Sequence, residues 1–481
     1  MKPARLTDGP LTSQLVRLAW PVFISRGLHT LYGVAATAWV GRISPEALAG
    51  VSTGFFASWT IAALGDVLVA GVTARVSQAV GARRDQTAGR IASAGAITAL
   101  LAGIVVAGIG FFGARPLFAL LFDNPEIERA GSTYLSLYAL LAPVFYLVFV
   151  FESVFRSCGN SRTPMFVAGT GSILNLILDP CLILGWGPFP RLEVHGAVLS
   201  IAISHTLVLA IYLILVAKQR FPLRLPVRSF PRERFAEDAR SILRIGAPQA
   251  VTGMVYSAVY LFLSRVTGQF GSGSLAALGV VNRLESLNYL SSVAMGMAVA
   301  AMVGQNLGGN RKDRAVRSAH RGAAIITILT ATMTTVYLVI PEPIVRIFVS
   351  DPDAIREGVE FLRIVALSQI FMGWEIVYGG AFMGSGNTVP AMQTALVTSL
   401  VRFPLAWGLA IPLGFGSSGV WWTISLTCIV RGLWMTAWFR RAAPSFSVAG
   451  AAARDETLSS GEIPLSRMPV SPESSPDLHV G

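Results

Sequence analysis

Long apolar stretches separated by short polar loops run through most of the sequence. Because a helix needs about 20 largely apolar residues to cross the hydrocarbon core of a bilayer, the pattern predicts twelve membrane-spanning helices. Their approximate ranges are 15–40, 48–76, 91–113, 132–157, 164–187, 194–217, 241–267, 275–304, 322–341, 358–384, 390–413 and 417–439. The sequence therefore predicts an all-α integral membrane protein.

The charge of the loops alternates along the chain. Arginine and lysine gather after the second, sixth and eighth spans, whereas aspartate and glutamate gather after the third and ninth. Positively charged loops stay on the cytoplasmic side, so we expect a multi-pass plasma-membrane protein with both termini in the cytoplasm. No small-residue cleavage site precedes the first span, and we expect this span to be retained.

The second half of the chain repeats the first at a constant offset of 227 residues. Residues 304–315, GQNLGGNRKDRA, match residues 77–88, SQAVGARRDQTA. Each repeat contributes six spans, an even number, so both repeats share one orientation. We therefore expect two six-helix lobes related by a parallel pseudo-two-fold axis, with the ligand site between them near mid-membrane. Pairs that match at this offset include Pro21 and Pro248, Gln78 and Gln305, Gly81 and Gly308, and Gly159-Asn160 and Gly386-Asn387.

The repeat also divides the chain into domains. We expect an N-lobe at 1–217, a cytoplasmic linker at 218–240, a C-lobe at 241–441 and a disordered cytoplasmic tail at 442–481. Prolines at 222, 226 and 231 prevent a continuous helix in the linker. The tail is rich in Ala, Ser, Pro and Glu, and it has too few apolar residues to form a core.

Composition supports a bilayer as the main partner. Only 13% of the residues are charged, against roughly 25% in soluble domains. The net charge of +12 comes from arginines in alternate loops, which favours the inner face of a membrane over nucleic acid as their partner. We expect a monomer that binds no nucleic acid.

The residues expected of an enzyme or an ATP-driven pump are missing from the sequence. The histidines are scattered without an HExxH pattern, the three cysteines are isolated, and no Gly-Lys-Ser/Thr motif occurs. We therefore expect neither catalysis nor a cofactor.

Four sequence motifs resemble those of a known protein family. They are WVGRISPEALAG at 39–50, FRSCGNSRTP at 155–164, GQNLGGNRKDRA at 304–315 and FMGSGNTVP at 382–390. Over about residues 14–440 the chain resembles the multidrug and toxin extrusion (MATE) family of secondary transporters. The resemblance implies export of organic, often cationic, compounds in exchange for protons or sodium ions, through two lobes that open a central cleft alternately to either side.

Two positions depart from the family pattern. Ala36 stands where the pattern often has an Asp, five residues before the glycine of the WVG motif, and Tyr256 stands where some branches have a Glu. The companion pattern in the fifth span is retained as Asn175 and Asp179. These two residues lie on one helix face, and their oxygen atoms suit either a proton or a sodium ion.

Ionisable residues inside a span cost about 2.5–3.5 kcal/mol each on insertion scales, so each is a functional hypothesis. We expect Glu285 and Glu375 to couple protons or to pair with a cationic substrate. The alternative is that each neutralises a nearby arginine, Arg283 or Arg402. The candidates are Arg26, His29, Asp66, Asp179, Glu285, Glu375 and Arg402.

Arg26 and Asp66 lie at the same expected depth in consecutive spans, about 15 Å from the inner end. Since consecutive antiparallel spans are usually neighbours, we expect them to form an ion pair. His29, one turn above Arg26, would be a titrating neighbour, and Asp66 would take over part of the role that Ala36 has lost. A purely structural ion pair is the alternative.

Aromatic residues of the second half are candidates for the cleft. Tyr256, Tyr260, Trp374 and Tyr378 could hold cations over their rings, although such residues also serve as packing or interface anchors. A related two-lobed fold could instead flip a lipid-linked precursor. That activity calls for a strongly basic cleft, whereas acids and bases are comparably frequent in these spans, so we favour an antiporter.

Overall fold

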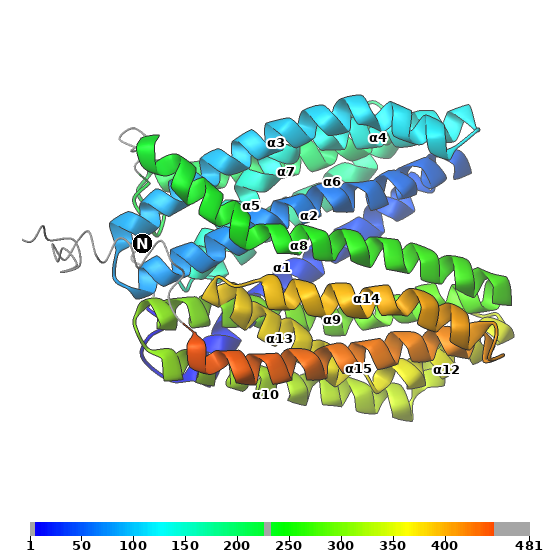
Figure 1. The fold of residues 1–481 in the computed structure, drawn as a ribbon. Helices are drawn as coiled ribbons and strands as arrows, with labels where there is room; N and C mark the ends of the chain where they lie inside the picture. The colour runs from blue at the N-terminus through cyan, green and yellow to red at the C-terminus, as the bar shows by residue number, and fades with distance from the viewer. Residues whose placement is uncertain (1–4, 226–231, 447–481) are drawn as a thin grey trace, which may run out of the picture.

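The computed structural model describes residues 5–225 and 232–446, and this part of the chain is helical without strands (Figure 1). The predicted tail beyond residue 446 and the linker prolines Pro226 and Pro231 lie outside the described residues. The helices are α1 (Leu11–Val40), α2 (Pro45–Gly81), α3 (Asp85–Leu121), α4 (Pro125–Leu140), α5 (Ala142–Ser157), α6 (Arg162–Leu184), α7 (Glu193–Ala217), α8 (Arg232–Thr267), α9 (Ser272–Gly308), α10 (Lys312–Val339), α11 (Pro341–Arg346), α12 (Pro352–Ala366), α13 (Gln369–Ser385), α14 (Val389–Ala410) and α15 (Gly416–Ala442), with short 3-10 turns at Gly268–Phe270 and Ala443–Ser445.

The sequence repeat is also a structural repeat. Helices α2 and α9 have 37 residues each, and both their first and their last residues are 227 positions apart. The pair α4 and α5 is bent by 50°, and the corresponding pair α12 and α13 by 51°. Gly159 and Gly386, which end the second helix of each pair, both have left-handed backbones with φ of 78° and 83°, a conformation that glycine adopts without steric cost. The duplication therefore extends to helix ends and turns.

The helices account for the predicted ranges, with corrections. Each range coincides with one helix or one bent pair. By length and hydropathy, however, seven helices of the described chain could cross a membrane, or up to nine if each bent pair is one span. The remaining ranges correspond to α1, α14 and α15, whose polar residues lower their hydropathy. Helix α8 begins at Arg232, so residues 232–240 of the predicted linker are helical.

The first helix of each half packs against the other half. Helix α1 contacts α9 and α10 as well as α6, and α8 contacts α2 and α3 as well as α14. Leu6, Leu15 and Leu18 accordingly belong to a hydrophobic core made mainly by α9, α10 and α13. In return, Ile242 of α8 is buried in the core of the N-terminal half. The first helix of each half thus packs on both halves.

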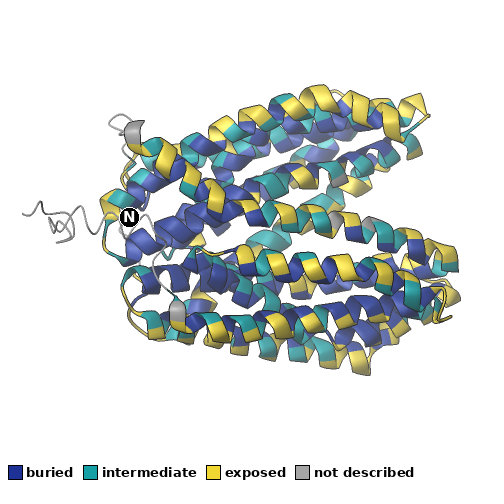
Figure 2. Ribbon diagram, in the orientation of Figure 1, coloured by how far each residue is buried: buried dark blue, intermediate teal, exposed yellow. Residues whose placement is uncertain are grey.

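The two halves are joined tightly at one end, which carries the turns 82–84 and 309–311 and which we call the basic end. Here α2 meets α8 and α9 so closely that a Cβ added at Gly81 would overlap the carbonyl group of Gln305. A Cβ at the equivalent Gly308 would overlap the carbonyl group of Gln78. Figure 2 shows buried residues concentrated along the helices near this end. Toward the opposite end, the ribbons of the two halves diverge (Figure 1).

Two glutamines form equivalent hydrogen bonds across this junction. Gln78 Nε2 donates a 3.0 Å hydrogen bond to the carbonyl oxygen of Gly384, and Gln305 Nε2 donates a 2.7 Å bond to that of Ser157. Donors and acceptors are each 227 positions apart. The Oε1 atom of Gln305 also accepts a 2.8 Å bond from the backbone of Leu6. Each repeat therefore fastens itself to the other through the same pair of positions.

Candidate functional site

A buried polar cluster lies between α6 and α7 in the N-terminal half. Asn175, Asp179 and Ser200 are at most 1% exposed. Asn175 Nδ2 donates a 3.2 Å hydrogen bond to Ser200 Oγ, which in turn donates to Asp179 Oδ1. The structure thus brings together the two residues predicted from the sequence and adds Ser200. A single serine in an apolar helix is too common for its sequence position to have identified it.

Two oxygen atoms of this cluster have no partner. Asn175 Oδ1 and Asp179 Oδ2 are both buried and accept no hydrogen bond from the described part of the chain. A buried carboxylate without a counter-charge is costly, and an unsatisfied acceptor adds to that cost. The cluster therefore has the chemistry to take up a proton or a small cation.

The predicted ion pair between Arg26 and Asp66 is wrong. No nitrogen–oxygen distance between these two described residues is within the 4.0 Å of an ion pair, although their charges still interact over a longer range. The assumption of adjacency failed because α1 packs mainly on α6 and α9 and only slightly on α2. His29 contacts Tyr32, with ring centroids 4.7 Å apart. Asp66 is an exposed residue of α2.

In the C-terminal half, Glu375 is neutralised by an arginine that the sequence analysis missed. Glu375 Oε1 lies 3.1 Å from Arg431 Nη1 in an ion pair whose side chains are 19% and 6% exposed. Arg431 also donates to the hydroxyl groups of Thr398 and Ser399, at 2.7 and 3.1 Å. The alternative considered from the sequence was neutralisation by Arg402, but α13 packs far more extensively on α15 than on α14. The rule that selected Arg402, an arginine inside a span, applies equally to Arg431.

Glu285 belongs to an amide network. Its Oε1 atom accepts a 2.9 Å hydrogen bond from Gln369 Nε2, and Gln369 Oε1 accepts one from Asn288 Nδ2. The alternative partner Arg283 is an exposed residue. Side chains two positions apart on a helix do not face each other, so the proposed neutralisation by Arg283 does not occur.

The predicted aromatic residues fall into two groups. Tyr256 and Tyr260 lie together on α8 with ring centroids 4.6 Å apart. Trp374 and Tyr378 lie on α13, where Trp374 Nε1 donates to Thr327 Oγ1 at 2.7 Å and the Tyr378 hydroxyl lies 3.1 Å from His320 Nδ1. Tyr378 is 5% exposed, so it is a packing residue in this conformation.

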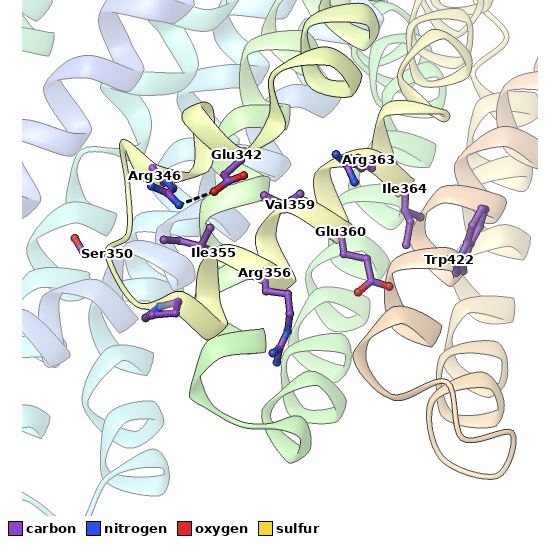
Figure 3. Close-up of a pocket in the computed structure, with 11 residues that line it drawn as sticks. Glu342, Arg346, Ser350, Ile355, Arg356, Val359, Glu360, Arg363, Ile364 and Trp422 are labelled. Carbon is purple, nitrogen blue, oxygen red and sulfur yellow. Dashed lines mark hydrogen bonds and ion pairs between the residues drawn. The ribbon is translucent and has the colours of Figure 1, made fainter.

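A surface hollow of about 820 Å³ lies at the diverging end, away from these clusters (Figure 3). Helices α11, α12 and α15 contribute to it, and the Glu342–Arg346 ion pair of 2.6 Å lies along one side. None of the residues predicted for the site lines it. The lining residues are Glu342, Arg346, Ser350, Pro352, Ile355, Arg356, Val359, Glu360, Arg363, Ile364 and Trp422.

Comparison with known proteins identifies the family. A probable multidrug resistance protein, NorM, of Thermotoga maritima is 26% identical over 85% of this chain and 88% of the relative. An FAD transporter of Shewanella oneidensis is 25% identical over 89% and 94% of the two chains. A MOP superfamily transporter from Pyrococcus furiosus has the same fold, with a TM-score of 0.85 at 21% identity over 93% of this chain and 99% of that chain.

The family model MatE matches residues 21–181 and again residues 248–407. The two matches begin 227 positions apart, at the prolines Pro21 and Pro248. Together they cover more than half of the chain. The protein therefore belongs to the multidrug and toxin extrusion family of membrane transporters.

Proposed function

We propose that the protein is a secondary active antiporter that exports small cationic or amphipathic organic compounds in exchange for protons or sodium ions. It works as a monomer in the plasma membrane, with twelve spans in two six-helix lobes and the basic end in the cytoplasm. Relatives described as multidrug resistance proteins support the substrate class. The relative described as an FAD transporter adds flavin dinucleotides to the compounds that need testing.

The main observation behind the proposal is that Asp179 Oδ2 is buried and has no hydrogen-bond partner in the described chain. A carboxyl group with no exposure and one unpartnered oxygen alternates between a charged and a neutral state when it binds and releases a cation. Ser200 orients the carboxyl group by donating to Oδ1, while Asn175 fixes Ser200. One proton would neutralise the carboxylate. A sodium ion would do so too, with the amide oxygen of Asn175 as a second hard ligand.

In this proposal the site opens alternately to the two sides of the membrane, which gives the exchange of substrate for ions its direction. The glutamine and glycine contacts close the basic end, whereas Asp66 on α2 and Tyr256 and Tyr289 on α8 and α9 remain exposed. Asp66 and Tyr289 lie close enough to interact electrostatically, so the two halves face each other there. We assign this conformation to the outward-open state, and opening of the basic end gives the inward-open state.

A flippase for a lipid-linked precursor is less well supported. Such a protein needs uncompensated positive charge for pyrophosphate along its path. Here Glu375 pairs with Arg431, so of the two buried arginines in the described C-terminal half only Arg402 lacks an ion-pair partner, a single charge against the two of a pyrophosphate.

Transport by everted membrane vesicles tests the proposal. Energised vesicles are challenged with cationic dyes and FAD, with and without sodium and with and without a pH gradient. Asp179→Asn removes the titratable oxygen and should abolish ion-coupled uptake, whereas Asp123→Asn, the same change at an exposed residue, should not. Equal uptake by the two variants would exclude Asp179 from the coupling, and lack of gradient-driven uptake by the unmodified protein would contradict antiport.

A further inference from the structure

Arg402 on α14 is a buried cation with spare hydrogen-bonding capacity. It is 1% exposed. Its Nε atom donates to Thr427 Oγ1 at 2.7 Å and its Nη2 atom lies 3.1 Å from Cys428 Sγ. The remaining nitrogen, Nη1, is buried and has no hydrogen-bond partner in the described chain. Two N–H groups of this guanidinium therefore have no acceptor.

The nearby carboxylates are engaged elsewhere. Glu375 is paired with Arg431, and Glu285 accepts its hydrogen bond from Gln369. Both act on Arg402 only at longer range, since neither makes an ion pair with it in the described structure. A buried arginine without a close counter-charge is strongly unfavourable. The charge on Arg402 is therefore available to an anionic oxygen atom from outside the chain.

Tyr256 and Tyr260 connect this guanidinium to exposed surface. Both phenols interact electrostatically with Arg402, and Tyr256 is 40% exposed. On the same helix, a Cβ at Gly246 would meet Val67, and one at Gly253 would meet Ala63, both on α2. Tyr256 and Tyr260 follow Gly253 at helical spacings of three and seven, so they continue the face that looks toward the N-terminal half.

We propose that Arg402, Tyr256 and Tyr260 form a subsite for an acidic group, a carboxylate or a phosphate, on the transported compound. The group accepts from the free Nη1 of Arg402 and is flanked by the two phenolic hydroxyl groups. Rotation of Tyr256 admits it, because Arg402 is covered in this conformation. Guanidinium groups match carboxylate and phosphate oxygens in geometry and charge. This inference rests on the proposed function, and it narrows the amphipathic class to compounds that bear an acid.

Binding to the purified full-length protein tests the subsite without any ion gradient. Calorimetric titration compares four probes that share one ring system: 2-naphthylacetate, 2-naphthyl phosphate, 2-naphthylacetamide and 2-(2-naphthyl)ethylamine. We expect the two anions to bind more tightly than the amide and the amine. Arg402→Gln should weaken anion binding about 10- to 100-fold, as expected for a lost hydrogen bond to a charged group, and should leave amide binding within a factor of about two of wild type.

Tyr256 provides variants that leave the buried arginine in place. Tyr256→Phe should weaken anion binding about 2- to 10-fold, the usual range for one neutral hydrogen bond, and Tyr256→Glu should reverse the preference toward the amine. Tyr212→Phe is the matched control. That tyrosine is fully buried in the N-terminal half, and its hydroxyl group has no partner there, so anion binding should not change.

Several outcomes would overturn the inference. They are equal or weaker binding of the anions relative to the amine, no binding by any probe, and anion binding that survives both Arg402→Gln and Tyr256→Glu. Vesicle transport separates this result from the proposed function. Anion preference in a protein that fails to transport contradicts antiport alone, whereas ion-coupled dye export without anion preference contradicts the subsite alone.

Discussion

Two carboxyl groups inside the predicted spans, the buried Asp179 and the partly buried Glu375, have opposite electrostatic surroundings. Glu375 has a guanidinium 3.1 Å away, whereas Asp179 has only neutral hydrogen-bond partners and one vacant oxygen. Glu375 thus has a counter-charge in the structure, whereas Asp179 has no positively charged hydrogen-bond partner in the described chain. The difference assigns Glu375 to holding helices together, and it fits the cation-exchanging role that we propose for Asp179.

This contrast predicts that two substitutions that remove a negative charge have opposite effects on the stability of the folded protein. Glu375→Gln leaves Arg431 buried without its counter-charge and should lower the free energy of unfolding by about 3 kcal/mol. Asp179→Asn removes a charge that nothing neutralises, so the folded protein should be at least as stable as the unmodified one. Thermal unfolding of both detergent-solubilised variants checks this. A larger loss for Asp179→Asn would reverse the roles assigned here.

A pH-dependent contact lies outside the membrane, in the segment before α1. Arg311, which lies 2.6 Å from Asp8, holds the pKa of the Asp8 carboxyl below its ordinary value of 3.8, mainly through their hydrogen bond. For a lowered pKa, the stabilisation is fully present above the ordinary value and is lost as the pH falls through the lowered one. Hydrogen exchange of residues 5–10, corrected for intrinsic rates, should therefore accelerate only below pH 3.8.

The variant Asp8→Asn supplies the control for this prediction. Without the carboxylate, exchange at residues 5–10 should already be fast at neutral pH and should show no acid transition. An unchanged acid transition in the variant would assign it to another group.

At this scale the sequence predicted which polar residues lie inside the helices better than it predicted their contacts. Asn175 and Asp179 were predicted because they match the pattern that the family resemblance implies for the fifth span. The pair between Arg26 and Asp66 was predicted from equal depth and from the assumption that consecutive spans are neighbours, and it is wrong because α1 packs only slightly on α2. Arg431 and Gln369 were missed for the same reason: their roles depend on α13 lying against α15 and α9.

At the scale of helices, the repeat offset of 227 residues related helix ends that the hydropathy pattern did not locate. It relates the ends of α2 and α9 and the starts of α3 and α10 without a gap. The bends at residue 141 and at residues 367–368 were not predicted. Pro143 is at the start of α5, but the corresponding residue in the second repeat is Ile370, so the second bend has no proline as a local signal. It is produced by packing that the two repeats share.

The glycines of the basic end provide a test of its closure. Gly308→Ala places a Cβ onto the carbonyl group of Gln78, so it should disfavour the closed junction and expose the buried Ser77. In a protein whose three native cysteines are replaced by serine, Ser77→Cys should then react faster with a maleimide. The rate should rise about tenfold for each 1.4 kcal/mol of lost closure.

Gly108→Ala is the matched control, because a Cβ at that position meets no atom within 4 Å. In the Gly108→Ala variant, the cysteine at position 77 should react with the maleimide at the same rate as in the parent protein. Equal rates for the two alanine variants would show that the junction does not limit access to Ser77.

At the scale of the whole molecule, orientation in the membrane is the main prediction. Arg314 lies in the first turn of α10, and Asp353 lies in the first turn of α12, beyond the far end of α10. Helix α10 has 28 residues, or about 42 Å of length, so the two positions lie on opposite sides of a bilayer. A cysteine at Asp353 should react with an impermeant reagent added outside intact cells, and one at Arg314 should not. The reverse labelling pattern would contradict a cytoplasmic basic end.

The packing of α1 on the second half has a consequence for biosynthesis. The backbone N–H of Leu6 donates to the side chain of Gln305, 299 residues later in the chain, and α1 packs on α9 and α10 of the second half as well as on α6. At synthesis rates of about 5–20 residues per second, the start of the chain waits roughly 15 to 60 seconds for its partner to emerge. During that interval α1 must be held by lipid, by α6 or by the insertion machinery. The nascent N-terminal half is therefore an unfinished intermediate that only the second half completes.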